Sequence, residues 1–216
     1  MALMAFEDRF ALPEVVLWRQ PSPWGNLMIA ASERGICRVA LPGVDDDDVI
    51  CGLVGLGSPP MIRREVIHVA ATQFEQYFRG ERRTFDLPVD LSLCGGVTRR
   101  ILTRLASVVS FGSIWSVDEL AREIGTPDAH EVVAAALRRN PVPILVPCHR
   151  IVSNTYGKNE SWSPSNMDSE VRSGLLRLEG WDADEFGIMQ EETTSALDKL
   201  GRSDAVVHLH ERLAVS

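Results

Sequence analysis

Apolar and polar residues alternate in the first part of the chain in the way expected of short β-strands. Three apolar segments, residues 15–19, 27–31 and 36–41, are separated by Pro-Ser-Pro-Trp-Gly at 21–25 and by Glu-Arg-Gly at 33–35. Apolar runs of this length between Gly- and Pro-containing turns are typical of a β meander. The pattern therefore predicts a small three-stranded antiparallel sheet.

A helix is predicted to follow this sheet and to cover it. Over residues 65–79 the apolar side chains recur at helical spacing, and a glycine comes directly afterwards. Residues 82–90 then form one more strand-like segment. Pro88 and the glycine pair at 95–96 indicate a boundary between two domains near this point.

Three helices are predicted next, and two of them form a helix-turn-helix. The first covers residues 97–109. Ser116 and Glu119 have the spacing of a capping box at the start of a short second helix. Gly-Thr-Pro at 125–127 then turns the chain into an alanine-rich helix at 128–139. Two short helices joined by a glycine-containing turn are typical of a helix-turn-helix, although many proteins that do not bind DNA contain one.

The last elements follow the asparagine and proline at 140–141. The apolar run at 142–146 predicts a buried strand, which leads to Pro-Cys-His-Arg at 147–150. A long polar loop at 153–166 precedes a last amphipathic helix at 167–178.

These elements predict an α+β fold. Residues 1–90 would form an N-terminal domain, a small antiparallel sheet with a covering helix. Residues 91–184 would form a mostly helical domain with the helix-turn-helix and the strand before Cys148, and residues 185–216 a tail without an assigned function.

Composition narrows the possible functions. The 216 residues are 45% hydrophobic, and 22 basic against 30 acidic residues give a net charge of −8. This charge argues against a protein that binds nucleic acid without regard to sequence, so any DNA contact must be local. The chain shows no signal peptide pattern and no apolar stretch long enough for a membrane span. We therefore expect a cytoplasmic protein with no membrane association.

The four cysteines are widely spaced and form no C-x-x-C pair, which indicates reduced thiols. Cys37 and Cys51 have no histidine nearby, and we expect no metal site.

Cys148 is the candidate reactive group. A cysteine is a good nucleophile as a thiolate, which a neighbouring base or positive charge stabilises. His149 and Arg150 follow it directly, and Glu179 at the end of the last helix is a candidate to orient the imidazole. The alternative is a structural thiol that ends a buried strand, which is the common role of free cysteines and which the spacing alone favours.

Residues 140–150, Asn-Pro-Val-Pro-Ile-Leu-Val-Pro-Cys-His-Arg, resemble the active-site signature of the alkylguanine-DNA alkyltransferases, also called methylated-DNA-protein-cysteine methyltransferases. The similarity extends to Leu-Arg-Leu-Glu-Gly at 176–180, to the helix-turn-helix, to residues 77–90 and to the meander with its Pro-Trp-Gly at 23–25. It covers residues 13–182.

The resemblance implies a role for each residue of the signature. Cys148 would accept the alkyl group, His149 would act as general base through a water molecule, and Glu179 would orient His149. Asn140 would brace the turn before the active-site strand, with Arg150 and Pro147 in supporting positions.

The family's reaction would then be expected of this chain. An alkylated guanine is flipped out of double-stranded DNA, and its 6-oxygen alkyl group passes to the cysteine in one displacement. Each molecule reacts once, no cofactor is needed, and a monomer is expected.

The sequence also departs from the family pattern. Glu131 stands where the family has an arginine that enters the base stack, and Val117 stands where it has a tyrosine that helps to rotate the nucleotide. Trp162, in the altered loop, is a candidate wall of the guanine pocket. Three further residues are candidate DNA contacts: Ala134 for close approach to the minor groove, and Arg138 and Arg139 for phosphates.

Two functional hypotheses follow. The first is direct repair of alkylated guanine in DNA, which the signature and the helix-turn-helix favour. The second is a repurposed protein with impaired base flipping, whose Cys148 takes an alkyl group from a small molecule or senses alkylating agents; the −8 charge and Glu131 favour it. A DNA-binding module that no longer reacts fits less well, because the catalytic residues are all present. We prefer repair.

Overall fold

A computed structural model describes residues 16–45, 49, 64–152 and 167–181. Cys51, the loop at 153–166 with Trp162, and the tail at 185–216 lie outside these described residues. No helix in the described part of the chain is long and apolar enough to cross a membrane.

The predicted meander is present as a three-stranded antiparallel sheet. It consists of β1 (Val16–Ser22), β2 (Gly25–Ser32) and β3 (Gly35–Ala40) in the order β1-β2-β3. The first turn is tighter than predicted, because β1 pairs with β2 as far as Ser22 and Gly25. Gly25 has a φ of +124°, a conformation that glycine adopts without strain.

Helix α2 (Arg64–Phe78) packs on one face of this sheet, as predicted. Its buried residues Ala70, Phe74 and Tyr77 belong to the main hydrophobic core. A second, smaller hydrophobic cluster contains Val49 and four buried residues of β2 and β3, namely Met28, Ala30, Cys37 and Ala40.

The strand predicted at 82–90 is reduced to a single bridge. Val89 pairs in parallel with Ile36 at the edge of β3. The N–H of Ile36 donates to the carbonyl of Pro88 at 2.8 Å, and the N–H of Asp90 donates to the carbonyl of Ile36 at 2.9 Å. Pro88 has no N–H with which to extend the ladder.

The helical half contains α3 (Gly96–Val108), α4 (Val117–Glu123), α5 (His130–Arg138) and α6 (Ser169–Leu178). The capping box of α4 is confirmed, since the Ser116 hydroxyl accepts from the Glu119 N–H and the Glu119 carboxylate accepts from the Ser116 N–H. Helices α4 and α5 form the predicted helix-turn-helix, and α5 begins two residues later than predicted.

The strand predicted at 142–146 is wrong. The segment is a turn, in which the N–H of Val146 donates to the carbonyl of Val142 at 3.0 Å. Ile144 has a φ of +76°, a left-handed conformation outside the region of regular β-strands. Prolines at 141 and 143 remove the donors that a strand would need. Four of the five residues at 142–146 are buried, and this burial, not pairing in a sheet, explains the apolar pattern.

Cys148 therefore follows a turn and begins a short 3₁₀ helix, η1 (Cys148–Arg150). Directly afterwards β5 (Ile151–Val152) pairs in parallel with β4 (Trp115–Ser116). This pairing holds the chain in place directly after the signature segment at 140–150.

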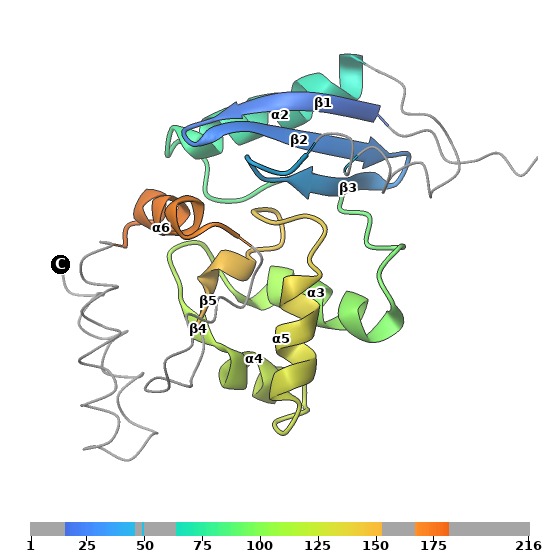
Figure 1. Cartoon of the computed structure of the whole chain (residues 1–216), viewed down its shortest axis with the longest axis vertical. Coiled ribbons are helices and arrows are strands. Elements are labelled where there is room, and N and C mark those ends of the chain that lie inside the picture. Colours follow the sequence, from blue (N-terminus) through green and yellow to red (C-terminus); the bar gives the residue numbers. More distant parts are fainter. Residues whose placement is uncertain (1–15, 46–48, 50–63, 153–166, 182–216) are drawn as a thin grey trace, which may run out of the picture.

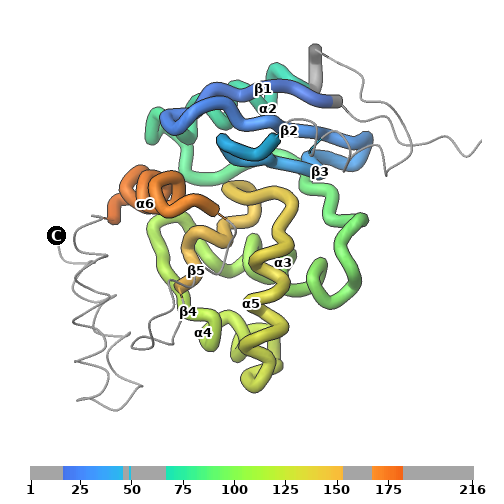
Figure 2. The backbone as a smooth tube through the Cα atoms, viewed as in Figure 1, coloured from blue at the N-terminus to red at the C-terminus, as the bar shows by residue number. Residues whose placement is uncertain are grey.

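The two halves of the molecule share one hydrophobic core. Figures 1 and 2 show the sheet with α2 as one layer and α3, α4 and α5 as the other, with α6 at the junction. The N–H of Val39 in β3 donates to the carbonyl of Pro141 at 2.8 Å. At the other end of the junction, the indole of Trp24 packs directly on Gly174 of α6, where a Cβ atom would lie 2.3 Å from it.

This contact predicts that Gly174→Ala destabilises the fold. In most helix interiors the change stabilises by about 1 kcal/mol, but here the new methyl group would overlap Trp24. We expect the free energy of unfolding to fall by about 1–3 kcal/mol, measured by urea denaturation. Gly96→Ala is the control, because nothing lies within 4 Å of its Cβ position. Equal stability of Gly174→Ala and the wild type would contradict the contact.

Candidate active site

Cys148 is almost fully buried, with 1% of its surface exposed, and Asn140 fixes the turn that presents it. The amide nitrogen of Asn140 donates to the carbonyl of Val146 at 2.8 Å and lies 3.2 Å from the Cys148 sulfur. Its amide oxygen accepts from the N–H of Val142 at 3.1 Å. One side chain therefore closes the turn and contacts the thiol. Pro147, also buried, precedes η1.

His149 and Glu179 form a fully buried pair. The distance between His149 Nε2 and Glu179 Oε1 is 3.0 Å, and both side chains have no exposed surface. Burial raises the pKa of Glu179, but hydrogen bonds from His149 and Arg150 outweigh burial and lower it to about 2. An ionised carboxylate can only accept hydrogen bonds, so Nε2 of His149 carries a proton and donates.

The other ring nitrogen of His149 is the basic one. Among the described residues no group forms a hydrogen bond with Nδ1, although the ring is completely buried. Burial lowers the pKa of His149 and outweighs the opposite effect of Glu179. The imidazole is therefore neutral at neutral pH, with a lone pair on Nδ1 that can accept a proton.

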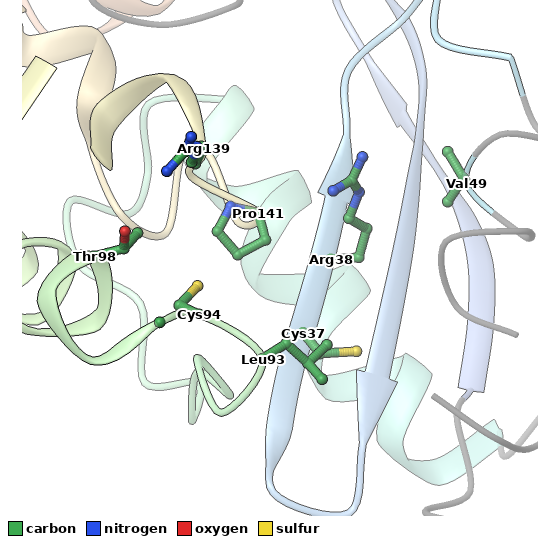
Figure 3. A pocket seen from close by; sticks show the side chains of 9 residues that line it. Cys37, Arg38, Val49, Leu93, Cys94, Thr98, Arg139 and Pro141 are labelled. Atoms are coloured by element: carbon green, nitrogen blue, oxygen red, sulfur yellow. The ribbon is translucent and has the colours of Figure 1, made fainter. Parts of the chain in front are cut away.

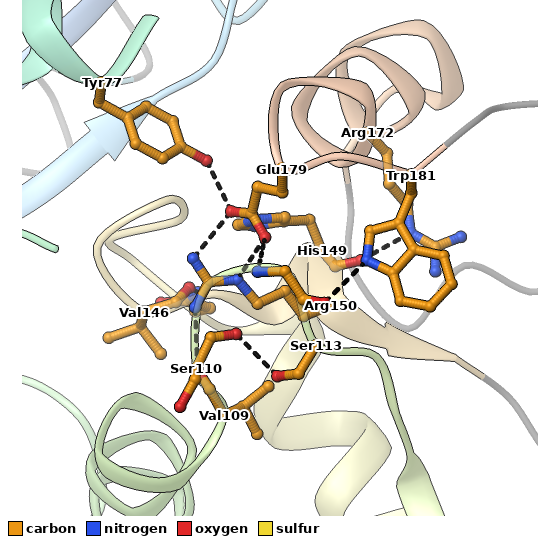
Figure 4. Close-up of polar contacts among 12 residues, drawn as sticks. Tyr77, Val109, Ser110, Ser113, Val146, His149, Arg150, Arg172, Glu179 and Trp181 are labelled. Atoms are coloured by element: carbon orange, nitrogen blue, oxygen red, sulfur yellow. Dashed lines mark hydrogen bonds and ion pairs between the residues drawn. The ribbon is translucent and has the colours of Figure 1, made fainter. Parts of the chain in front are cut away.

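Glu179, the residue after α6, accepts from three further groups (Figure 4). The Tyr77 hydroxyl donates to Oε1 at 2.8 Å. Arg150 donates to Oε2 through Nε and to Oε1 through Nη2, both at 2.8 Å. The N–H of Gly112 donates to Oε2 at 3.3 Å. This arrangement holds the carboxylate in one orientation.

Arg150, a predicted supporting residue, lies against Glu179. Its guanidinium group contacts Glu179 and donates to the carbonyl of Val109 at 2.8 Å. Its positive charge therefore balances the buried carboxylate.

A pocket of about 220 Å³ opens beside Cys148. Arg38 of β3 and Met167 line it together with residues at the end of α5, among them Arg138, Arg139 and Asn140. The pocket thus lies between the sheet and the helix-turn-helix, and a group that enters it approaches the thiol.

A second pocket, of about 350 Å³, adjoins the first (Figure 3). Arg38 and Arg139 line both pockets, and Cys37 and Cys94 line the second. Burial raises the pKa of Cys37 to about 11, so its thiol stays protonated. Within the described ranges, no three His, Cys, Asp or Glu side chains are grouped in a way that could hold a metal ion.

Two of the residues predicted to contact DNA or the pocket are enclosed instead. Val117 and Ala134 have no exposed surface, and Val117 belongs to the main hydrophobic core. Neither side chain lies at a surface that DNA could contact, and the roles predicted for them stay predictions. Glu131 and Arg139 are exposed, and Arg138 is half-buried at the rim of the pocket beside Cys148.

Sequence reasoning missed Tyr77, Arg172 and Arg38. Tyr77 follows the helical spacing of the other apolar residues of α2, although a buried tyrosine usually has a partner for its hydroxyl. Arg172 of α6 donates to the carbonyls of His149 and Ile151 at 3.3 and 3.0 Å. Arg38 is the exposed polar residue of an otherwise buried strand, a signal that the sequence does contain.

Comparison with known families divides the chain into two matching parts. Residues 20–91 match the ribonuclease-like domain of 6-O-methylguanine DNA methyltransferase, and residues 97–181 match the DNA binding domain of the same family.

Known proteins resemble most of the chain. The constitutive methylated-DNA–protein-cysteine methyltransferase of Bacillus subtilis is 31% identical over 162 residues, which cover 73% of this chain and 91% of the relative. The Cricetulus griseus methyltransferase of the same name is 32% identical over 169 residues, 74% of this chain and 79% of the relative.

Solved structures agree with this assignment. The O6-methylguanine methyltransferase of Mycobacterium tuberculosis has a TM-score of 0.60 at 25% identity, and the match covers 76% of this chain and 92% of that one. A structure of the M. tuberculosis protein in complex with DNA gives a TM-score of 0.60 at 25% identity, with 77% and 92% covered. The chain therefore belongs to the methylated-DNA–protein-cysteine methyltransferase family.

Proposed function

We propose that this protein is a monomeric suicide alkyltransferase that takes the alkyl group from the 6-oxygen of guanine in double-stranded DNA onto Cys148. The observation that carries the proposal is the buried His149–Glu179 pair next to Cys148, with Nδ1 of His149 available as a base. A purely structural cysteine would need no such pair. All these groups come from one chain, in keeping with a monomer.

The reaction begins with the thiol proton. Cys148 passes it to Nδ1 of His149 through a water molecule, and Glu179 stabilises the imidazolium that forms. The thiolate attacks the alkyl carbon, so that an S–C bond forms while the C–O bond to guanine breaks. The electron pair of the C–O bond stays on guanine, which takes up one proton at N1. The proton lost by the thiol thus balances the alkyl group lost by guanine.

The charge on Glu179 sets how easily this transfer starts. Burial lowers the pKa of His149, and Arg150, 2.8 Å from the carboxylate, adds to this effect against that of Glu179. His149 is therefore neutral before the reaction, and the thiolate forms when His149 takes the proton. The thioether product is chemically stable, and each molecule reacts once.

DNA contact would rely on the basic residues around the pocket. Arg38, Arg138 and Arg139 supply positive charge beside Cys148, although the chain carries a net charge of −8. We propose that the chain has two domains, an N-terminal domain at residues 1–90 and an alkyltransferase domain at 91–184. The pocket beside Cys148 lies where these two domains meet. Glu131 on α5 is exposed and would face the phosphates unfavourably.

The test is intact mass after incubation with a duplex that contains one 6-O-methylguanine. We expect a gain of one methyl group, which peptide mapping locates on Cys148. Cys148→Ser should take up none, whereas the control Cys94→Ser should react like the wild type. Failure of the wild type to gain the methyl group, in a sample whose Cys148 still reacts with a small alkylating agent, would reject DNA as the donor.

The pH dependence of the transfer tests His149 as the base. The lowered pKa of His149 means that the base stays available as the pH falls to about 6.5, the ordinary pKa of imidazole. We expect the single-turnover rate constant at saturating DNA to be constant from about pH 8 to 6.5 and to fall below that. In His149→Gln it should rise up to about tenfold per pH unit toward the pKa of the free thiol, about 8.5. The same flat profile in His149→Gln would exclude His149 as the base.

Glu131→Arg tests the orientation of α5 on DNA. The change replaces an exposed negative charge by a positive one, so we expect duplex affinity to rise about fivefold to tenfold at 0.1 M salt, with a steeper salt dependence. Glu81→Arg, at an exposed site just after α2, makes the same change in net charge and is the control. An equal gain in both variants, measured by fluorescence anisotropy, would mean that α5 does not face the DNA.

A further inference from the structure

We propose that Tyr77 of α2 is a positioning residue for alkyl transfer, because its hydroxyl holds Glu179 in the orientation that receives the hydrogen bond from His149. The inference rests on the proposed function and deepens it. It makes the N-terminal half of the chain a part of the active site.

The first support is the origin of the donors around Glu179. His149, Arg150 and Gly112 all belong to the helical half of the molecule. Tyr77 lies 102 residues away in sequence and reaches Oε1 at 2.8 Å. Of the donors to Glu179 from the described segments, Tyr77 alone comes from the layer that contains the sheet (Figure 4).

The second support is that both the ring and the hydroxyl of Tyr77 are held in place. The ring is 1% exposed and packs against three aromatic neighbours at centroid distances of 5.1 to 6.3 Å, namely Phe78, Phe85 and Phe111. Burial and the neighbouring Glu179 raise the pKa of Tyr77, so the hydroxyl keeps its proton and remains a donor. A rigid neutral donor fixes the direction of a carboxylate without adding charge.

The third support is that Tyr77 and His149 donate to the same oxygen, Oε1 of Glu179. The oxygen shares its negative charge between the two donors. Without the hydroxyl, the carboxylate would interact more strongly with His149 and would be less firmly held. Arg150 and Arg172 are the other charged groups whose positive potential acts on His149, and the substitution leaves both in place.

The experiment compares Tyr77→Phe with Gln73→Met. Gln73 lies one turn earlier on α2, is 7% exposed and accepts a hydrogen bond from the N–H of Asp86 at 2.8 Å. Both variants remove one hydrogen bond made by a buried side chain of α2, and only Tyr77→Phe affects Glu179. The readouts are the single-turnover rate constant for methyl transfer at saturating duplex, its pH dependence, and the urea midpoint.

We expect Tyr77→Phe to lower the rate constant about tenfold and to move the acid limb of its pH profile to higher pH. Gln73→Met should change the urea midpoint and leave the rate constant and the acid limb unchanged. In a Glu179→Gln background, the addition of Tyr77→Phe should lower the rate constant by less than about twofold, because the two residues act through one contact.

Two outcomes would overturn the proposal. The first is a wild-type rate constant and a wild-type acid limb in Tyr77→Phe. The second is a double variant with Glu179→Gln whose rate loss equals the product of the losses in the two single variants. Absence of methyl transfer in the wild-type protein would instead reject the proposed function, so the two failures are distinguishable.

Discussion

The rest of the structure depends on one buried carboxylate. Removing the charge of Glu179 from water costs several kcal/mol, which is recovered only if every lone pair of the carboxylate finds a donor. Its donors come from α2, from the segment that follows α3, and from η1, which carries the reactive cysteine. These segments must therefore meet at one point, and the requirement joins the sheet layer to the helical layer.

The balance of charge around Glu179 explains why the signature contains an arginine next to a histidine. The buried carboxylate of Glu179 raises the pKa of the imidazole and so favours its protonation. Burial is the largest influence on the pKa of His149 and keeps the imidazole neutral, and Arg150 adds to it by opposing the effect of Glu179. The same three consecutive residues thus supply the nucleophile, the base and the counter-charge, and the tight 3₁₀ turn sends their side chains in different directions.

The surface around the pocket shows how a protein with a net charge of −8 can contact DNA. Positive side chains gather at the C-terminal end of α5 and on β3, next to Cys148. The acidic Glu131 lies at the opposite end of α5. Under the proposed function, DNA affinity would come from a few local phosphate contacts at this basic surface.

The sequence by itself determined the elements whose signals are local. Apolar periodicity located the three strands and α2, and the Ser116–Glu119 spacing located the start of α4. The resemblance of residues 140–150 to the family signature identified the reactive segment, since the spacing alone favoured a structural thiol. Only the tertiary structure decided the rest. The apolar run at 142–146 forms a turn, because prolines stand at 141 and 143 and Ile144 is left-handed. Val117 is buried by packing, and the Tyr77 hydroxyl donates to Glu179, which is 102 residues away in sequence. Such contacts depend on how distant segments pack, which the local pattern of polar and apolar residues does not encode.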